Sequence, residues 1–279
     1  MKKQLTWKGK LVTHAILIAF SLMMIYPVLW WVFASFKTTE DLTRASLLPA
    51  VWVWENYPNG WNALPTYTFT YFYLNSLKVN IAGTVLHVAA ASLVAFGFAR
   101  LTFPLKNFWF SILLLTIMLP HQVTLIPQYA MFHSFGWINT YLPLVVPAAM
   151  GGAFFIFLIV QFIRSIPKEL DESAKIDGCS WFGIYWRIIM PLTKPALVSA
   201  TIFSFIWGWE DYFGPLIYLN SVDKYTIPLA LRMFIDTQSA VAWGQLLAMS
   251  LLSIVPPVLI FFLAQKHFVE GIATTGLKG

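Results

Sequence analysis

Two adjacent acids, Glu210 and Asp211, interrupt an otherwise apolar stretch of the chain. Ionisable groups in such a stretch are costly and therefore face the interior of a helix bundle or a water-filled path. Neighbouring helical positions diverge by about 100°, so the two acids are not expected to act as a close carboxylate dyad. We favour a polar lining of a pathway over proton transfer as their role.

A second polar spot lies where His121 and Gln122 follow Pro120. Proline kinks a helix and frees backbone carbonyls, so we expect a break here that lines the same path. A lone histidine near a kink is more often hydrogen-bonded than a metal ligand, and no other histidine lies at ligand spacing. The sequence holds no H-E-x-x-H, no G-x-S-x-G and no G-x-x-x-x-G-K-S/T phosphate loop. We expect no metal site, no catalytic residues and no bound cofactor in this chain.

The composition points to a membrane protein. Of the 279 residues, 58% are hydrophobic and 11% charged, against roughly 45–50% and about 25% in a soluble domain. With a mean hydropathy of +0.69, the chain has too little polar surface for a water-soluble body. A disordered protein, a disulfide scaffold and a nucleic-acid-binding domain are excluded on the same ground.

Six stretches reach the length of about 20 mainly apolar residues that a membrane span needs. They are Leu11–Phe36, Asn75–Ala99, Phe108–Met131, Tyr141–Ile163, Ala196–Leu216 and Trp243–Ala264. The predicted fold class is therefore all-α, a polytopic membrane protein with six transmembrane helices. Thirteen Lys and Arg residues flank the spans on one side and four on the other, so we expect both termini to be cytoplasmic.

Aromatic residues gather outside the spans. The outer loop from Lys37 to Leu74 is rich in Trp, Tyr and Pro, which suits a folded cap or, as we favour, anchoring at the headgroup level. Trp209, beside the acids of span five, either stacks on a ligand in the pathway or belongs to the same kind of interfacial belt.

The segment between spans four and five predicts two short helices. Pro167 suits a first helical turn, and the acids that follow it favour the positive end of the helix dipole. The first helix should run to about Asp177 and stop at Gly178, and Ser180 can cap a second helix that ends before Pro191. Along the first helix, Lys168–Glu172 and Asp171–Lys175 are spaced to pair. A solvated or interfacial loop helix is the alternative, but the small Ala174 and the aromatic second helix favour docking in a groove of another protein.

This segment resembles a known signature. Glu172-Ser-Ala-Lys-Ile-Asp-Gly178, followed by Ile188-Ile-Met-Pro-Leu192, is similar to the cytoplasmic coupling loop of binding-protein-dependent type I ABC importer permeases. Ser173 replaces the usual alanine, which makes the docking face slightly more polar. Further similar stretches are Leu74-Asn-Ser-Leu, Met118-Leu-Pro-His-Gln-Val-Thr-Leu-Ile-Pro, Trp209-Glu-Asp-Tyr-Phe-Gly-Pro-Leu, and the tail from Phe268-Val-Glu-Gly to Gly-Leu-Lys-Gly279. The resemblance covers nearly the whole chain and is strongest to the smaller permease subunit of maltose and oligosaccharide systems.

The resemblance implies that the chain is a transport subunit and no enzyme, with ATP and Mg bound by partner subunits. The loop helix would seat in a cleft of a cytoplasmic ATPase through Leu170, Glu172, Ser173, Ala174, Asp177 and Gly178. The tail, with Gly271, Lys278 and Gly279, would contact the ATPase dimer. In such a system a departure from the usual Asn-Asp at Glu210 leaves that side chain's role open.

The implied partners are a second homologous permease, two ATPase subunits, an extracytoplasmic solute-binding protein and a carbohydrate, in a bacterial inner membrane whose lipid surrounds the spans. The outer loop Asn220 to Ala240 would meet the binding protein. The expected organisation is an N-terminal part (1–70), a permease core (71–268, with coupling loop 164–195) and a tail (269–279). The alternatives are an ion-coupled secondary transporter that uses Glu210 and Asp211, and an ABC permease for a non-sugar solute.

Overall fold

The apolar stretches form helices in a computed structural model that describes residues 7–64, 66–236 and 242–276. Four helical segments are long and apolar enough to cross a membrane, and the number rises to six if each of two sharply bent helix pairs counts as one span. The four are Trp7–Ala34, Phe69–Arg100, Leu142–Ser165 and Trp243–Gln265. The all-α, multi-span fold class is therefore confirmed.

The chain divides into two units. Unit 1 comprises residues 1–70 and 231–254, and unit 2 comprises residues 71–230 and 255–279. Two helices cross from one unit to the other, α3 (Phe69–Arg100) and α13 (Ile227–Asp236). The remaining described elements of unit 1 are α1 (Trp7–Ala34), η1 (Asp41–Thr43), α2 (Asn56–Trp61) and α14 (Trp243–Ser253).

Unit 1 contains the folded outer loop. The rings of Phe36, Trp52, Trp54 and Tyr57 contact one another at centroid distances of 4.7–6.2 Å. The buried Asn56 amide donates to the carbonyls of Ser35 and Lys37 at 2.9 and 3.0 Å. The aromatic residues of this loop therefore pack on one another, as a folded cap requires, and their anchoring at the headgroup level stays a prediction.

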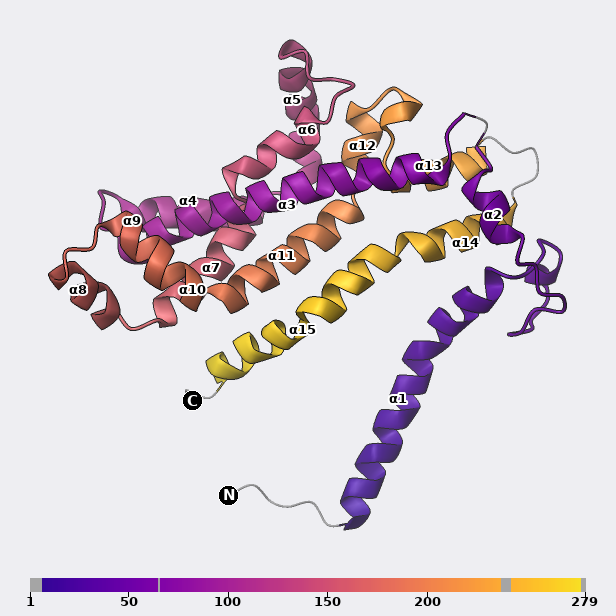
Figure 1. Cartoon of the computed structure of the whole chain (residues 1–279), viewed down its shortest axis with the longest axis horizontal. Helices are drawn as coiled ribbons and strands as arrows, with labels where there is room; N and C mark the ends of the chain where they lie inside the picture. The colour runs from indigo at the N-terminus through magenta and orange to yellow at the C-terminus, as the bar shows by residue number, and fades with distance from the viewer. Residues whose placement is uncertain (1–6, 65, 237–241, 277–279) are drawn as a thin grey trace. The chain divides into compact units, whose positions relative to one another are not determined.

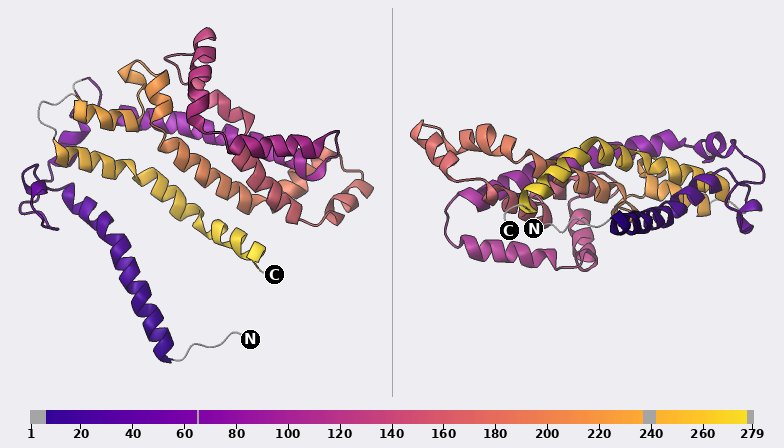
Figure 2. Two further views of the ribbon diagram at one scale, coloured as in Figure 1. Left: turned by 180° about the vertical axis from the view of Figure 1, so that it is seen from behind. Right: turned by 90° about the horizontal axis from the view of Figure 1, so that it is seen from below.

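Unit 2 holds the rest of the helices. They are α4 (Lys106–Ile117), α5 (His121–Ser134), α6 (Leu142–Val145), η2 (Val146–Met150), α7 (Ala153–Ser165), α8 (Glu169–Ile176), α9 (Trp181–Ile184), the π turn η3 (Tyr185–Ile189), α10 (Met190–Leu192), α11 (Lys194–Trp209), α12 (Phe213–Tyr218), η4 (Val222–Lys224) and α15 (Val255–Gly276). Helices α11 and α15 run side by side (Figure 1). Within unit 2, α8 lies at one end of the long α3, and α12 lies near the other end (Figures 1 and 2).

The third span is not one continuous helix. Helices α4 and α5 meet at an angle of 101°, and the corner is visible in Figure 2. Pro120 precedes α5 with an extended backbone, φ −61° and ψ 130°, as expected for a residue that cannot donate an N–H to continue a helix. The predicted break beside His121 is therefore confirmed, and the crossing of the membrane by the stretch Phe108–Met131 as one broken span stays a prediction.

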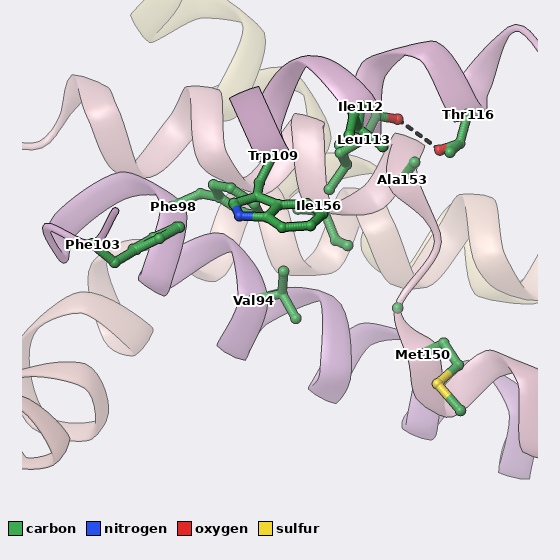
Figure 3. A pocket seen from close by; sticks show the side chains of 11 residues that line it. Val94, Phe98, Phe103, Trp109, Ile112, Leu113, Thr116, Met150, Ala153 and Ile156 are labelled. Atoms are coloured by element: carbon green, nitrogen blue, oxygen red, sulfur yellow. Dashed lines mark hydrogen bonds between the residues drawn. The ribbon is translucent and has the colours of Figure 1, made fainter. Parts of the chain in front are cut away.

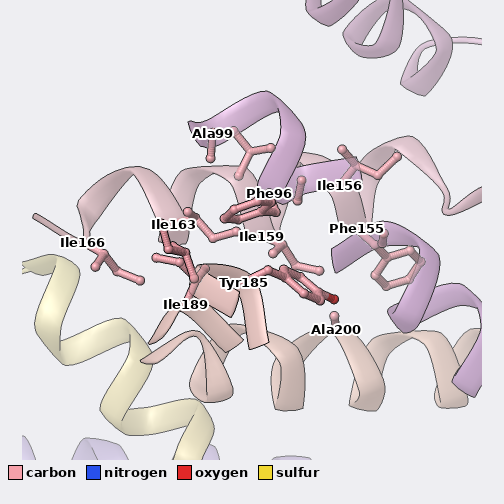
Figure 4. Close-up of a cluster of buried hydrophobic side chains, with 14 of the residues drawn as sticks. Phe96, Ala99, Phe155, Ile156, Ile159, Ile163, Ile166, Tyr185, Ile189 and Ala200 are labelled. Atoms are coloured by element: carbon pink, nitrogen blue, oxygen red, sulfur yellow. The ribbon is translucent and has the colours of Figure 1, made fainter. Parts of the chain in front are cut away.

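The core of unit 2 lies between α3, α7, η3 and α11. Its buried side chains include Phe96, Ile159, Ile163, Tyr185 and Ile189 (Figure 4). The backbones approach closely where η2 ends: Gly151 has φ +63°, and a Cβ there would lie 2.7 Å from the Ala91 backbone nitrogen. Only glycine fits such an approach, so this contact fixes α7 against α3.

Candidate functional site

The segment between α7 and α11 forms the two predicted short helices. Helix α8 ends at Ile176, and Gly178 follows with φ +82°, the left-handed conformation that closes a helix at low cost in glycine. The Ser180 side-chain oxygen accepts from the Gly183 N–H at 3.2 Å and caps α9. These local predictions are confirmed, except that α8 starts at Glu169, so Pro167 precedes the first turn.

The second helix does not end before Pro191, as the sequence predicted. Helical structure continues from Trp181 to Leu192 and then bends by 76° into α11. The π turn η3 comes directly before α10, which holds Pro191 in its first turn. A π turn already replaces the i→i−4 bonding that proline would break, so the chain passes Pro191 without leaving the helix.

Helix α8 is held by a buried ion pair with α3. Arg100 Nε lies 2.7 Å from Asp171 Oδ2, and the two side chains are only 2% and 8% exposed. Arg100 Nη2 also donates to the Ile166 carbonyl at 2.9 Å. Burial raises the pKa of the Asp171 carboxyl above its usual range, and the Arg100 guanidinium opposes that rise.

The sequence predicted different partners for these charges. Asp171 pairs with Arg100, 71 positions earlier in the chain, instead of with Lys175 on its own helix. The Lys175 ammonium lies 3.7 Å from the centre of the Trp181 ring, a cation–π contact that ties α8 to α9. Long-range packing therefore overrides the i,i+4 pairing.

The predicted coupling residues divide between two faces of α8. Ala174 is buried in the core of unit 2, together with Ile166. Leu170, Glu172, Ser173, Asp177 and Gly178 are exposed. The Ser173 hydroxyl donates to the Glu169 carbonyl at 2.8 Å, so Ser173 adds little unsatisfied polarity to the exposed face. Ala174 therefore packs α8 against the core of unit 2, and only the exposed residues can contact a partner.

Large apolar side chains accompany this exposed face. Ile176 is 88% exposed and Phe182 is 68% exposed, and Leu170, Trp181 and Trp186 are exposed as well. Scattered exposed apolar residues are ordinary, but five within one loop of 17 residues mark an interaction surface. We call these five residues, together with Glu172, the α8–α9 surface.

The two acids of span five do not lie within a helix. Helix α11 ends at Trp209, Glu210 is its C-cap, and α12 starts at Phe213. Asp211 Oδ1 accepts from the Gly214 N–H at 3.1 Å, which satisfies a free donor at the start of α12. The continuous span Ala196–Leu216 is therefore wrong, although both acids are exposed as a lining role requires.

The other predicted lining residues occupy different settings. Trp209 is 5% exposed and its ring stacks on Phe205 at a centroid distance of 5.5 Å. Gln122 is exposed in the first turn of α5. His121 begins the same helix, but its side chain lies outside the described part of the structure. The contacts of Trp209 are those of a packed core residue, and the lining role of all three stays a prediction.

The predicted tail is described only in part. Gly271 lies within α15, whereas Lys278 and Gly279 lie outside the described residues. Residues 237–240 of the loop Asn220 to Ala240 also lie outside the described residues.

Two asparagines that the sequence did not single out hold the end of unit 2 that is opposite α8. The Asn139 side-chain oxygen accepts from the N–H groups of Asn220 and Ser221, both at 3.1 Å. The Asn75 amide donates to the carbonyls of Asp223 and Tyr225 at 2.8 and 3.1 Å. The positive φ of 60° at Asn139 suits asparagine more than most residues. Local sequence signals do not indicate either contact.

Comparisons with known proteins agree with this architecture. Residues 87–273 match the family described as "Binding-protein-dependent transport system inner membrane component". A probable ABC transporter permease protein, YurM of Bacillus subtilis, is 35% identical over 97% of this chain and 89% of its own length. The arabinooligosaccharides transport system permease protein AraQ of Halalkalibacterium halodurans is 30% identical over 91% of each chain. The sn-glycerol-3-phosphate transport system permease protein UgpE of Brucella melitensis is 32% identical over 96% of this chain and 97% of its own.

A solved structure shares the fold. The crystal structure of a bacterial ABC transporter involved in the import of the acidic polysaccharide alginate contains a chain that matches with a TM-score of 0.79. Sequence identity is 20%, over 96% of this chain and 100% of that one.

The helical, multi-span architecture defines a multi-pass membrane protein. The chain belongs to the family of binding-protein-dependent transport system inner membrane components. It is a permease subunit of an ABC importer, a non-catalytic, multi-pass protein of the inner membrane, and ATP binding lies in partner ATPases. The dependence on a binding protein sets the ion-coupled alternative aside.

Proposed function

We propose that this permease imports a carbohydrate, as an oligosaccharide, and that the α8–α9 surface docks on a cytoplasmic ATPase subunit. Both termini then lie in the cytoplasm, and the opposite end of unit 2, held by Asn139 and Asn75, faces the solute-binding protein. A second, homologous permease supplies the other half of the pathway, and residues 269–279 contact the ATPase pair.

The observation that supports the docking proposal is the difference between the two faces of α8. One face is fixed by the Arg100–Asp171 pair and by the buried Ala174, while the other presents Glu172 beside exposed apolar side chains. A helix that is rigidly held on one face and exposes both charged and large apolar side chains on the other suits a groove in a partner. Force applied to its free face passes to α3 and to the core of unit 2 through these buried contacts.

The substrate class rests on the relatives. AraQ is named for arabinooligosaccharides, and the structural match comes from an alginate importer. UgpE is named for sn-glycerol-3-phosphate, which supports a small phosphorylated polyol as the second candidate. The assembled importer in liposomes, with its binding protein, separates the two. Stimulation of ATP hydrolysis by arabinooligosaccharides and not by sn-glycerol-3-phosphate is expected, and the reverse result overturns the carbohydrate assignment.

Site-specific photo-crosslinking tests the docking. A photoreactive amino acid replaces Ile176, which is 88% exposed on α8, in the full complex in native membranes. Crosslinked peptides identified by mass spectrometry are expected to come from a protein that carries a P-loop. The matched control places the same group at Asn220, which is exposed at the opposite end of unit 2. Capture of the P-loop protein from position 220 and not from position 176 would reverse the proposed orientation.

A further inference from the structure

An apolar groove opens on unit 2 between α3, α4 and α7. It has a volume of about 510 Å³, within the range of about 300–1,000 Å³ that ligand sites occupy. Helix α3 contributes Val94 and Phe98, α4 contributes Trp109 and Leu113, and α7 contributes Ile156 (Figure 3). The polar side-chain groups of the lining are the Thr116 hydroxyl, which donates to the Leu113 carbonyl at 2.7 Å, and the indole N–H of Trp109. The rest of the lining is apolar and suits a hydrocarbon chain.

Cations gather at one end of this groove. Lys106 begins α4 and lies three and seven residues before Trp109 and Leu113, so it heads the stripe of α4 that lines the groove. It also lines a second hollow, of about 410 Å³, which shares Phe103 with the groove. The Lys106 ammonium donates to the Leu101 carbonyl at 2.7 Å, which uses one of its three protons.

Helix α7 brings a second cation to the same end. Arg164 lies eight residues after Ile156, two turns further along α7, and its guanidinium is 4.8 Å from the centre of the Phe110 ring on α4. Arg164 is exposed, and its positive charge, like that of Lys168, acts on Lys106. The positive charges of Lys106, Arg164 and Lys168 therefore act on one another at this end of the groove, which favours the binding of an anion there.

We propose that this groove binds an anionic phospholipid. One acyl chain lies between α3, α4 and α7, and the phosphate sits between Lys106 and Arg164. Basic pockets at the cytoplasmic ends of transmembrane helices bind anionic headgroups in this way. The lipid comes from the cytoplasmic leaflet, so this inference rests on the orientation given under the proposed function.

Native mass spectrometry of the purified importer tests the headgroup contact. The complex is mixed with phosphatidylglycerol or with phosphatidylethanolamine that carries the same acyl chains. Wild type is expected to retain phosphatidylglycerol preferentially. The Lys106→Gln, Arg164→Gln double variant should lose that binding about tenfold or more, because each nearby cation contributes to anion attraction, with phosphatidylethanolamine unchanged.

The matched control is Lys8→Gln, Lys10→Gln, which removes the same charge from exposed positions at the start of α1. It should leave phosphatidylglycerol binding intact. An equal loss in both double variants, or equal retention of the two lipids by wild type, overturns the proposal.

A second variant tests the acyl-chain contact. Ala153→Phe places a ring in the groove and should displace one lipid of either kind. An unchanged number of bound lipids contradicts the acyl-chain contact. All measurements use complexes that still contain the ATPase subunits. Equal retention of the two lipids by a wild-type complex that keeps its ATPase therefore refutes the lipid site alone, whereas failure of the wild-type chain to hold an ATPase refutes the proposed docking.

Discussion

The two ends of unit 2 are held by different kinds of contact. At the α8 end, one buried ion pair joins Arg100 to Asp171, and the exposed face of the helix carries both charged and apolar side chains. At the opposite end, Asn139 and Asn75 bind backbone groups of residues 220–225 through several neutral hydrogen bonds. The stabilising free energy at this end is shared among several neutral hydrogen bonds, whereas at the α8 end it depends mainly on one pair of charges. Removal of a single group should therefore matter most at the α8 end.

The largest expected effect follows from Arg100→Met. This change leaves the Asp171 carboxylate buried without its partner, which costs about 3–5 kcal/mol. A lower melting temperature of the purified complex and faster proteolysis between residues 166 and 180 would show it. The double variant Arg100→Met, Asp171→Leu removes both charges and should recover most of the stability. A loss below about 1 kcal/mol in the single variant would mean that the pair is not what holds α8.

Asn139→Ala should have the second largest effect. It removes the acceptor for two backbone N–H groups and places alanine at a positive φ, for an expected loss of about 2–3 kcal/mol. Hydrogen exchange should rise in residues 219–226 and not in α8. Asn220→Ala, at an exposed position in the same loop, serves as the control and should change stability by less than about 0.5 kcal/mol. Faster exchange in α8 would show that the two ends are not independently held.

A matched pair of glycines gives a smaller effect. Gly178 and Gly136 have φ values of +82° and +69°, and neither has an atom within 4 Å of an added Cβ. Alanine at either site should therefore cost about 1–2 kcal/mol through backbone strain alone. Melting temperatures of the two variants should agree, while only Gly178→Ala should weaken retention of the ATPase. Weaker retention in both variants would point to general destabilisation.

The smallest stability effect is expected for Glu172→Arg. The residue is exposed, so the free energy of unfolding should change by less than about 0.5 kcal/mol. Co-purification of the ATPase should nevertheless fall, because the change reverses a charge on the α8–α9 surface. Glu210→Arg, also an exposed acid, is the control. Unaltered ATPase retention in the Glu172 variant would remove this residue from the docking surface.

Local rules predicted the local parts of the structure. The end of α8 at Gly178 and the Ser180 cap depend on neighbouring residues alone, and hydropathy located the long helices. Contacts between distant segments were not predictable in this way. Asp171 pairs with Arg100 and not with Lys175, because folding brings the end of α3 against α8.

The breaks within spans were harder to predict for a related reason. Hydropathy measures the composition of a window and not the direction of its backbone. The window Ala196–Leu216 is apolar enough to read as one span despite Glu210 and Asp211, yet α11 stops at Trp209, and Asp211 caps the next helix. The corner between α4 and α5 was predictable because Pro120 carries its own backbone signal.

Helix α3 supplies one side chain to the contacts that hold each end of unit 2. Asn75 binds the loop that contains residues 223–225, and Arg100 binds α8. The two residues are 25 positions apart on α3, a length of about 38 Å at 1.5 Å per residue. An unbroken helix is stiff along its axis, so it can transmit a displacement from one end to the other. A displacement of α8 along that axis would arrive at residues 223–225 with little loss in amplitude, without any rearrangement of side chains on the way.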